Sequence, residues 1–454
     1  MNSTKNNSTL LGTSPIKKLL FTQAMPAAIG FMVMSLNMVV DTFFVGQYIG
    51  ELAIGAISVV FPISFLLSAI GMSIGIGGGS IVSRALGANN KDKAQLSFNN
   101  QISLTFFLAF LIILVGVFFS TPILNLFGAK GNIFPYADTY FSIVLIGIPF
   151  LAISMMANNN LRAEGKPKIA MTVLLIPSIV NIFLDYVFID HLKMGMAGAG
   201  WATTISYLGC ALYIFYFYLA GKGELKVLPK KFILSKEIVV EIFQLGSVNL
   251  VRQGTLSILA ILLNTSLFIY GNQIPEMGGE TAISVYGLAS RLAMFAFFPL
   301  IGIAQGFMPI AGYNFGASQY KRVKQVINIS LIYGFIVAAF ICAILTYSST
   351  WIPYIFTSDI KLIKYSPTAI FWLFITAPTV VFHLIGPSYY QAIGKALPAL
   401  LLTITKQGLF LIPLVIILPR YYGIDGIWYS FPIADILSAI TCFYFLRKGM
   451  KILA

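Results

Sequence analysis

The sequence carries little charge for its length. Asp, Glu, Lys and Arg make up 10% of its 454 residues, against about 25% in an average soluble domain. A soluble protein of this size needs far more charge to cover its surface, so the composition excludes a soluble enzyme and a disordered protein. Cysteine is equally scarce, and Cys210, Cys342 and Cys442 all lie in apolar stretches, which excludes a secreted disulfide scaffold.

Motifs that would hold a cofactor or a nucleic acid are missing as well. The sequence has no nucleotide-binding loop, no zinc or haem spacing, and no basic stretch interleaved with aromatic residues. The net charge of +14 therefore does not indicate a nucleic-acid partner. We expect no cofactor other than a coupling ion.

Long apolar runs dominate what remains, because 58% of the residues are apolar. A helix that crosses a bilayer needs about 20 mostly apolar residues. Nine runs of at least 22 residues contain no charged residue, and three more contain one each. The lipid core requires internal backbone hydrogen bonding, so we expect helices rather than a barrel of strands. The twelve predicted spans are 19–40, 52–83, 94–129, 139–161, 169–189, 194–221, 253–275, 292–320, 325–358, 365–394, 396–419 and 426–446.

The basic residues between the spans predict the orientation. With the N-terminus in the cytoplasm, 21 basic residues fall in inside segments and five in outside segments. This asymmetry predicts a multi-pass protein of the cell membrane with both termini in the cytoplasm. We expect residues 1–16 to form a loose cytoplasmic tail, the first span to be retained rather than cleaved as a signal peptide, and 448–454 to form a second tail.

The sequence matches itself at an offset of 229 residues, at corresponding places in the hydropathy pattern. The matched residues are Ile74, Gly77, Ile81, Gly87 and Ala88 with Ile303, Gly306, Ile310, Gly316 and Ala317; Pro149 with Pro378; and Ala163, Gly165 and Lys166 with Ala392, Gly394 and Lys395. We therefore predict an all-α integral membrane protein with two parallel six-helix lobes related by pseudo-two-fold symmetry. The predicted parts are an N-terminal lobe (17–220), a cytoplasmic linker (221–236) and a C-terminal lobe (237–447).

Two acidic residues interrupt the apolar spans of the first half. Asp41 lies 23 residues after Lys18, or about 34 Å along a helix, and Asp185 lies 17 residues after Lys168, or about 26 Å. Both carboxylates should therefore lie in the outward portion of the bilayer. A charge at this depth is costly and usually faces a cavity or a partner.

Three polar residues accompany these acids. Asn37 and Asn181 precede them by four residues and so share their helix faces, and Thr203 lies near the outer start of the sixth span. The oxygens of this set could gather around one small cation, or an Asp could carry a proton. The alternatives are a solvated position for Asp41, a structural hydrogen-bonded role for Asp185, and hydrogen bonding between helices for Asn181 and Thr203.

The second half supplies different candidates. Lys406 could be a counter-ion to Asp435, a counter-ion to an anionic group, or a side chain that reaches toward the interface. His383 either titrates near neutral pH or is simply hydrogen-bonded. In the first half, Pro26 removes one backbone hydrogen bond, and the resulting bend could respond to protonation of Asp41 on the same helix.

Seven stretches together resemble the multidrug and toxic compound extrusion (MATE) family, in its bacterial multidrug branch. The resemblance extends over about residues 15–447, and its most specific segments include VDTFFVG around Asp41, NIFLDYVF around Asp185 and GWATTIS around Thr203. The stretches are 25–58, 75–94, 158–171, 179–189, 194–206, 299–324 and 390–403.

The resemblance implies specific roles for some of these residues. It assigns Asp41, Asn181, Asp185 and Thr203 to a cation site for protons or sodium, and Pro26 to a helix that bends during transport. The segment 245–260 lacks the acidic residue with which other family members bind sodium in the second lobe. The resemblance transfers no role to Asn37, His383, Lys406 or Asp435, which remain accessory candidates.

The leading hypothesis is a cation-coupled antiporter that exports organic, often cationic, compounds by alternating access. One chain should suffice as a functional monomer, with small organic molecules and membrane lipid as its partners. A lipid-linked precursor flippase of the same superfamily is the alternative, but it should line its cavity with several cationic side chains. A membrane-embedded enzyme is the third hypothesis, although His191 and His383 lie far apart and no catalytic residues stand out.

Overall fold

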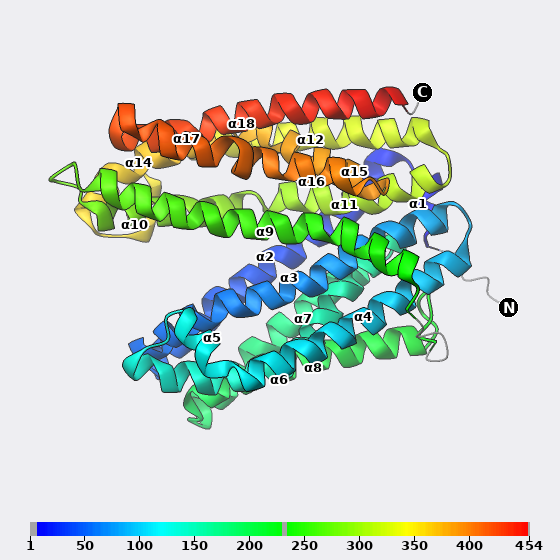
Figure 1. Cartoon of the computed structure of the whole chain (residues 1–454), viewed down its shortest axis with the longest axis horizontal. Coiled ribbons are helices and arrows are strands. Elements are labelled where there is room, and N and C mark those ends of the chain that lie inside the picture. The colour runs from blue at the N-terminus through cyan, green and yellow to red at the C-terminus, as the bar shows by residue number, and fades with distance from the viewer. Residues whose placement is uncertain (1–6, 229–233, 453–454) are drawn as a thin grey trace. The chain divides into compact units, whose positions relative to one another are not determined.

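The computed structural model describes residues 7–228 and 234–452, and within these ranges the chain is helical and contains no strand (Figure 1). Two short 3₁₀ segments, η1 (Gly131–Ile133) and η4 (Ala377–Thr379), and two π-helical segments, η2 (Tyr186–His191) and η5 (Thr405–Leu411), adjoin the α-helices. The α-helices are α1 (Thr9–Thr13), α2 (Ile16–Tyr48), α3 (Glu51–Gly87), α4 (Lys91–Phe118), α5 (Ser120–Leu126), α6 (Phe134–Ala163), α7 (Pro167–Asp185), α8 (Gly195–Leu219), α9 (Lys236–Gly271), α10 (Gly279–Ala296), α11 (Phe298–Gly316), α12 (Tyr320–Tyr347), α13 (Ile352–Phe356), α14 (Ile360–Phe374), α15 (Val380–Ala392), α16 (Ala396–Ile404), α17 (Ile412–Ile417) and α18 (Pro419–Ile452).

The number of spans agrees with the prediction. Among the described residues, eleven helical segments are long and apolar enough to cross a membrane, or twelve when α10 and α11, which meet at a 43° bend, count as one broken span. The predicted start of this eighth span at residue 292 is wrong, because the span begins at Gly279. The apolar run was interrupted by Arg291, but that side chain is exposed on α10, so its charge does not end the helix.

Helix extends into both predicted tails. Within the N-terminal segment, α1 buries Leu11 and Gly12, and the Asn314 side-chain amide donates to the Leu11 carbonyl at 2.9 Å. The prediction that this whole segment is loose is therefore wrong for residues 7–16, whereas residues 1–6 lie outside the described part. At the other end, α18 continues through the predicted tail to Ile452.

The chain divides into two compact units. Unit 1 comprises residues 1–14, 29–249 and 312–318, and unit 2 comprises 15–28, 250–311 and 319–454. Each contains its own apolar core, built around α3 and α6 in unit 1 and around α9, α10, α14 and α18 in unit 2. The units differ from the predicted lobes mainly in their first spans, since the start of α2 groups with unit 2 and the start of α9 with unit 1.

Two glycines that match in the sequence repeat explain why the start of α2 groups with unit 2 and the start of α9 groups with unit 1. A Cβ atom on Gly77 of α3 would lie 2.3 Å from the Ile242 carbonyl oxygen of α9, within unit 1. A Cβ on Gly306 of α11 would lie 2.9 Å from the Ala24 amide nitrogen of α2, within unit 2. Each repeat therefore uses the same glycine to admit a backbone from the first span of the other repeat.

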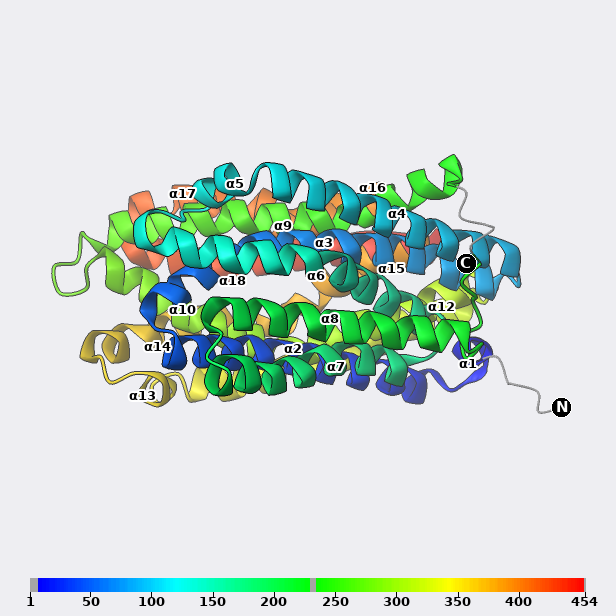
Figure 2. The ribbon, with the colours of Figure 1, turned by 90° about the horizontal axis from the view of Figure 1, so that it is seen from below.

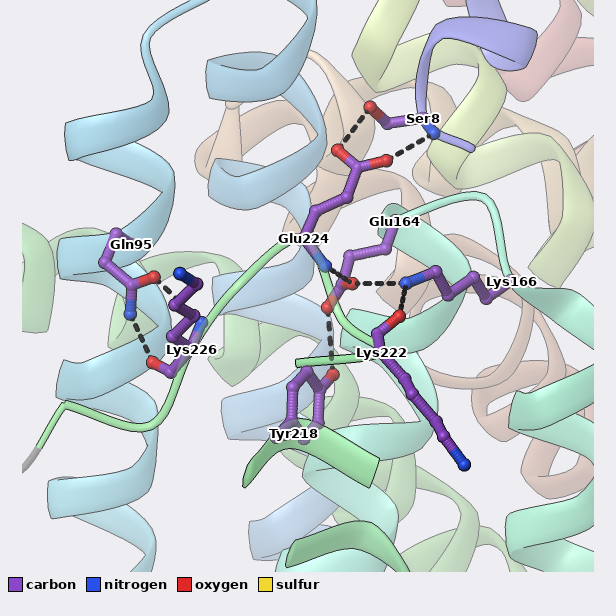
Figure 3. A network of polar contacts seen from close by, with 8 residues as sticks. All are labelled: Ser8, Gln95, Glu164, Lys166, Tyr218, Lys222, Glu224 and Lys226. Atoms are coloured by element: carbon purple, nitrogen blue, oxygen red, sulfur yellow. Dashed lines mark hydrogen bonds and ion pairs between the residues drawn. The ribbon is translucent and has the colours of Figure 1, made fainter. Parts of the chain in front are cut away.

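Hydrogen bonds around Glu164 hold the described part of the predicted linker within unit 1, as Figure 3 shows. The buried Glu164 carboxylate accepts hydrogen bonds from the Glu224 backbone N–H at 2.7 Å and from the Tyr218 hydroxyl at 3.0 Å. The Glu224 carboxylate in turn accepts from the backbone N–H and the hydroxyl of Ser8 at 2.8 and 2.7 Å. These bonds hold residues 8 and 224 together, while residues 229–233 of the linker lie outside the described part.

Candidate functional site

The five polar residues predicted in the first half meet within unit 1. Asn37 and Asp41 lie one turn apart on α2, Asn181 and Asp185 lie in the last turns of α7, and Thr203 lies in the third turn of α8. Figure 2 shows these three helices as neighbours. At Asp185 the helix changes to the π-helical segment η2, a local widening that often occurs at functional sites.

Asn181 connects the set through its side-chain amide. Its Oδ1 accepts a hydrogen bond from Asn37 Nδ2 at 2.7 Å. Its Nδ2 faces Asp185 Oδ1 at 3.4 Å and Thr203 Oγ1 at 3.5 Å, two long and weak contacts. The amide thus joins α2, α7 and α8 and orients its neighbours.

The carboxyl groups of Asp41 and Asp185 lie close enough to interact directly. Asp185 is fully buried, whereas Asp41 is half-buried. One oxygen of each, Asp41 Oδ1 and Asp185 Oδ2, is buried and has no hydrogen-bond partner among the described residues. A buried acceptor without a hydrogen-bond partner costs free energy, and a bound proton or cation would remove this cost. The pair is therefore suited to take up a proton or a cation.

A cavity of about 400 Å³ lies beside the carboxyl pair in unit 1. Asn37, Asp41, Asn181 and Thr203 line it together with apolar side chains from α2, α3, α6, α7 and α8. Asp185 does not line the cavity and reaches it only through its neighbours. Asp41 is therefore the acidic group of a cavity wall that otherwise combines apolar, aromatic, hydroxyl and amide side chains.

Two tyrosines of this cavity were not among the residues predicted from the sequence. Tyr140 on α6 is 7% exposed and lies in electrostatic range of both Asp41 and Asp185, and Tyr207 on α8 lies in range of Asp41. Both residues line the cavity wall. The chain has 22 tyrosines, many of them in apolar stretches, and no sequence signal separated these two from lipid-facing ones.

The donor set limits the cation that the site could hold. Within residues 7–228 and 234–452 there is no group of three or more His, Cys, Asp or Glu side chains that could hold a metal ion. Two carboxylates with an amide oxygen and a hydroxyl are hard oxygen donors, which fit a proton or a small cation such as sodium and disfavour soft transition metals.

The accessory candidates of the second half lie in unit 2, in a separate cluster. Lys406 Nζ lies 2.6 Å from Asp435 Oδ1, and the Thr376 hydroxyl donates to Asp435 Oδ2 at 2.9 Å. Of the three hypotheses for Lys406, the structure thus shows the counter-ion to Asp435. His383 is buried on α15, and Pro26 lies on the part of α2 that belongs to unit 2, where the helix continues without a break.

Comparisons with known proteins give consistent matches over the whole chain. A family model described as MatE matches residues 26–187 and 257–417. The multidrug export protein MepA of Staphylococcus saprophyticus subsp. saprophyticus is 27% identical over 437 residues, which cover 94% of this chain and 94% of that protein. Among solved structures, one described as MATE in complex with MaD3S has a TM-score of 0.92 at 24% identity, over 99% of both chains. An outward-facing multidrug resistance MATE family transporter of the MOP superfamily has a TM-score of 0.91 at 24% identity, over 100% of this chain and 99% of that one.

Proposed function

The chain belongs to the MatE family, and on this premise we propose that it is an antiporter that exports organic, often cationic, compounds in exchange for protons or sodium ions. The similarity to a multidrug export protein over nearly the whole length supports export. The two-lobe fold shared with MATE structures supports alternating access.

One observation carries the coupling proposal: the two unpartnered carboxylate oxygens of Asp41 and Asp185 lie beside a cavity that Asp41 itself lines. A coupling cation at this pair and an organic cation in the cavity would be attracted by the same negative charge. Binding of one therefore weakens binding of the other, which is the thermodynamic requirement for exchange. The aromatic wall at Phe61 and Tyr140 adds favourable contacts for flat cations.

The experiment is transport of a fluorescent organic cation by the purified protein in liposomes, with proton and sodium gradients imposed separately. We expect one of the two gradients to drive transport by the wild type, and Asp41→Asn to abolish it. The matched control is Asp92→Asn, which removes an exposed carboxylate of the same unit. Gradient-driven transport that survives in Asp41→Asn would refute coupling at this pair, and equal loss in Asp92→Asn would show a non-specific effect of charge.

The remaining parts of the proposal concern placement in the cell membrane. We place both termini in the cytoplasm, on the basic-residue asymmetry, and one chain as the functional unit. Single cysteines test the orientation when they are introduced at Lys91 and at Lys130, two exposed positions at opposite ends of α4 and α5, in a variant whose three native cysteines are replaced by alanine. In intact cells an impermeant thiol reagent should label the cysteine at 130 and not the one at 91.

A further inference from the structure

Unit 2 contains a partly buried cluster in which positive groups outnumber negative ones. Four helical segments contribute to it: α9, α15, η5 and α18, with Thr376 just before η4. The members are Arg252, Thr376, His383, Lys406 and Asp435. We call this set the unit 2 cluster.

Asp435 is the carboxylate of the cluster, and both of its oxygens are engaged. Oδ1 faces the Lys406 ammonium at 2.6 Å, and Oδ2 accepts from the Thr376 hydroxyl at 2.9 Å. The Lys406 and Asp435 side chains are 17% and 5% exposed, so the pair is largely shielded from solvent. One positive charge of the cluster is thereby compensated within the fold.

Arg252 is not compensated. No hydrogen bond or ion pair joins its guanidinium to another residue in the described ranges, and its Nε is buried without an acceptor. The side chain projects from α9 one turn before Thr255, whose methyl group would lie 3.5 Å from a Cβ on Gly408 of η5. This contact places the Arg252 turn of α9 against the segment that carries Lys406.

His383 is in the vicinity of both cations. Both Lys406 and Arg252 are within electrostatic range of its ring, which is 8% exposed. Its Nδ1 is buried and has no hydrogen-bond partner among the residues that the structure describes. The unit 2 cluster therefore contains two cations and an imidazole that can donate a hydrogen bond, but only one carboxylate.

An unpaired charge inside a membrane protein is expensive, and such groups usually face a ligand or a partner. A guanidinium presents a planar fork of N–H donors that matches a carboxylate or a phosphate, and an adjacent ammonium strengthens the attraction. The unit 2 cluster therefore has the composition of an anion site. The carboxyl pair of unit 1 has the opposite polarity, since it gathers acids.

We infer that the unit 2 cluster is an anion-binding subsite that takes the carboxylate or phosphate group of an amphipathic ligand. Arg252 and Lys406 bind the anionic oxygens, His383 donates a hydrogen bond, and Asp435 holds Lys406 until the ligand displaces it. The relevance of this subsite to export rests on the proposed function, and it extends the exported compounds to those that carry an acidic group. Anion binding itself does not depend on transport.

Binding to the purified full-length protein tests the inference without any ion gradient. The probe is 1-pyrenebutyrate, an amphipathic aromatic acid, and its comparison ligand is the uncharged methyl ester, both measured by fluorescence anisotropy. We expect the wild type to bind the acid about tenfold tighter than the ester, the difference that one charge-assisted contact gives. Arg252→Gln and Lys406→Gln should each bring the acid close to the affinity of the ester.

The variant Asp435→Asn distinguishes an anion-binding subsite from a structural ion pair. It removes the carboxylate that competes with the anionic group of the ligand for Lys406. The acid should bind several-fold tighter to this variant, whereas a merely structural ion pair predicts unchanged or weaker binding. Arg291→Gln is the matched control, since it removes the same charge from an exposed position of unit 2. Ester binding by each variant reports that the fold is intact, and Arg252→Lys, which keeps the charge and loses the fork, should bind the acid with intermediate affinity.

Several outcomes would overturn the inference: equal binding of acid and ester by the wild type, weaker binding of the acid to Asp435→Asn, or equal losses of affinity for the acid in Arg291→Gln and Arg252→Gln.

Competition between the bound probe and unlabelled ligands identifies the source of the anionic group. Displacement of the probe by dioctanoyl phosphatidylglycerol and not by the phosphatidylcholine analogue indicates a lipid headgroup, whereas displacement by benzoate alone indicates a free carboxylate. Each of these supports an anion site, and failure of both competitors contradicts it. A failure of gradient-driven transport would affect only the proposed function.

Discussion

Gly87 and Gly316 meet where the ends of α3 and α11 cross with their backbones in contact. A Cβ on Gly87 would lie 2.0 Å from the Tyr313 carbonyl oxygen, and a Cβ on Gly316 would lie 2.0 Å from the Arg84 carbonyl oxygen. The two glycines occupy matching positions of the sequence repeat. The crossing is therefore reciprocal, and each position excludes any side chain without movement of the backbone.

The first prediction follows from this crossing. Gly316→Ala should destabilise the protein by about 1–3 kcal/mol, the usual cost of overpacking a well-packed site. A thermal melt of the purified protein, compared with the wild type in the same detergent, measures the change. Gly87→Ala should give a similar loss because the crossing is reciprocal.

Gly209→Ala is the matched control for these variants. A Cβ at Gly209, inside α8, would have no atom within 4 Å, so alanine there should be neutral or slightly stabilising through its higher helix propensity. An unchanged melting temperature in Gly316→Ala would show that the two backbones are not in contact at this crossing.

The second prediction concerns the amide that joins the candidate cation site. Asn181→Ala removes the bond to Asn37 and the contacts to Asp185 and Thr203, so coupled transport should fall by about tenfold or more, as for residues that orient an ion site. Asn37→Ala removes that same bond and a long contact to the Ser178 carbonyl at 3.4 Å, but leaves Asn181 beside Asp185 and Thr203, so it should cost less. Transport in liposomes under the effective gradient measures both.

Asn125→Ala, at an exposed position of α5, should transport like the wild type and serves as the control. A larger loss in Asn37→Ala than in Asn181→Ala would reverse the expected order. It would mean that Asn37, rather than Asn181, organises the site.

The third prediction concerns the ion pair between Lys406 and Asp435. Lys406→Met leaves a buried carboxylate without its counter-ion and should destabilise the protein by about 3–5 kcal/mol. The double variant Lys406→Met/Asp435→Leu should recover most of this loss, since it removes the charge that was left unpaired. Thermal melts of the two single variants and the double variant give the coupling energy.

The ion pair of Lys193 and Asp190, which is more exposed than the unit 2 pair, provides the comparison. Its lysine is 70% exposed, so Lys193→Met should cost under about 1 kcal/mol. Additive effects of the two changes in the unit 2 pair would show that Lys406 and Asp435 do not interact in the folded protein.

The fourth prediction is a pH dependence that arises at Glu164. Burial raises the pKa of the Glu164 carboxyl from 4.5 to about 7, against the lowering effects of the nearby Lys166 ammonium and of hydrogen bonds from Glu224 and Tyr218. Because the folded protein holds this proton more tightly than the unfolded chain, the stabilisation is fully present below pH 4.5 and is lost as pH rises through about 7.

Melting temperatures measured between about pH 5 and pH 8 test this linkage. The wild type should lose stability over the range, and Glu164→Gln should show a flatter dependence together with a lower stability overall, since an amide cannot accept from both donors. Glu51→Gln, at an exposed position of α3, should keep the wild-type slope. An equal slope in wild type and Glu164→Gln would assign the pH dependence to other groups.

The sequence by itself determined the broad organisation of this protein. Runs of apolar residues predicted helical spans, because the cost of exposing backbone polar groups to lipid allows few alternatives. The four-residue spacing from Asn181 to Asp185, and from Asn37 to Asp41, placed each pair on one helix face, because helix geometry is fixed by the backbone alone. Family resemblance then assigned most of the candidate cation site.

Only the tertiary structure decided which of these faces meet. The partner of Lys406, the position of Tyr140 beside Asp41, and the burial of Glu164 under the linker depend on how helices distant in sequence are rotated and packed. Hydropathy is averaged along one segment of the chain and contains no information on how distant helices pack. It also placed the start of the eighth span too late, because it could not show that the Arg291 side chain lies on an exposed helix face. The π-helical turns after Asp185 and around Lys406 also follow from packing, since no local sequence signal specifies them.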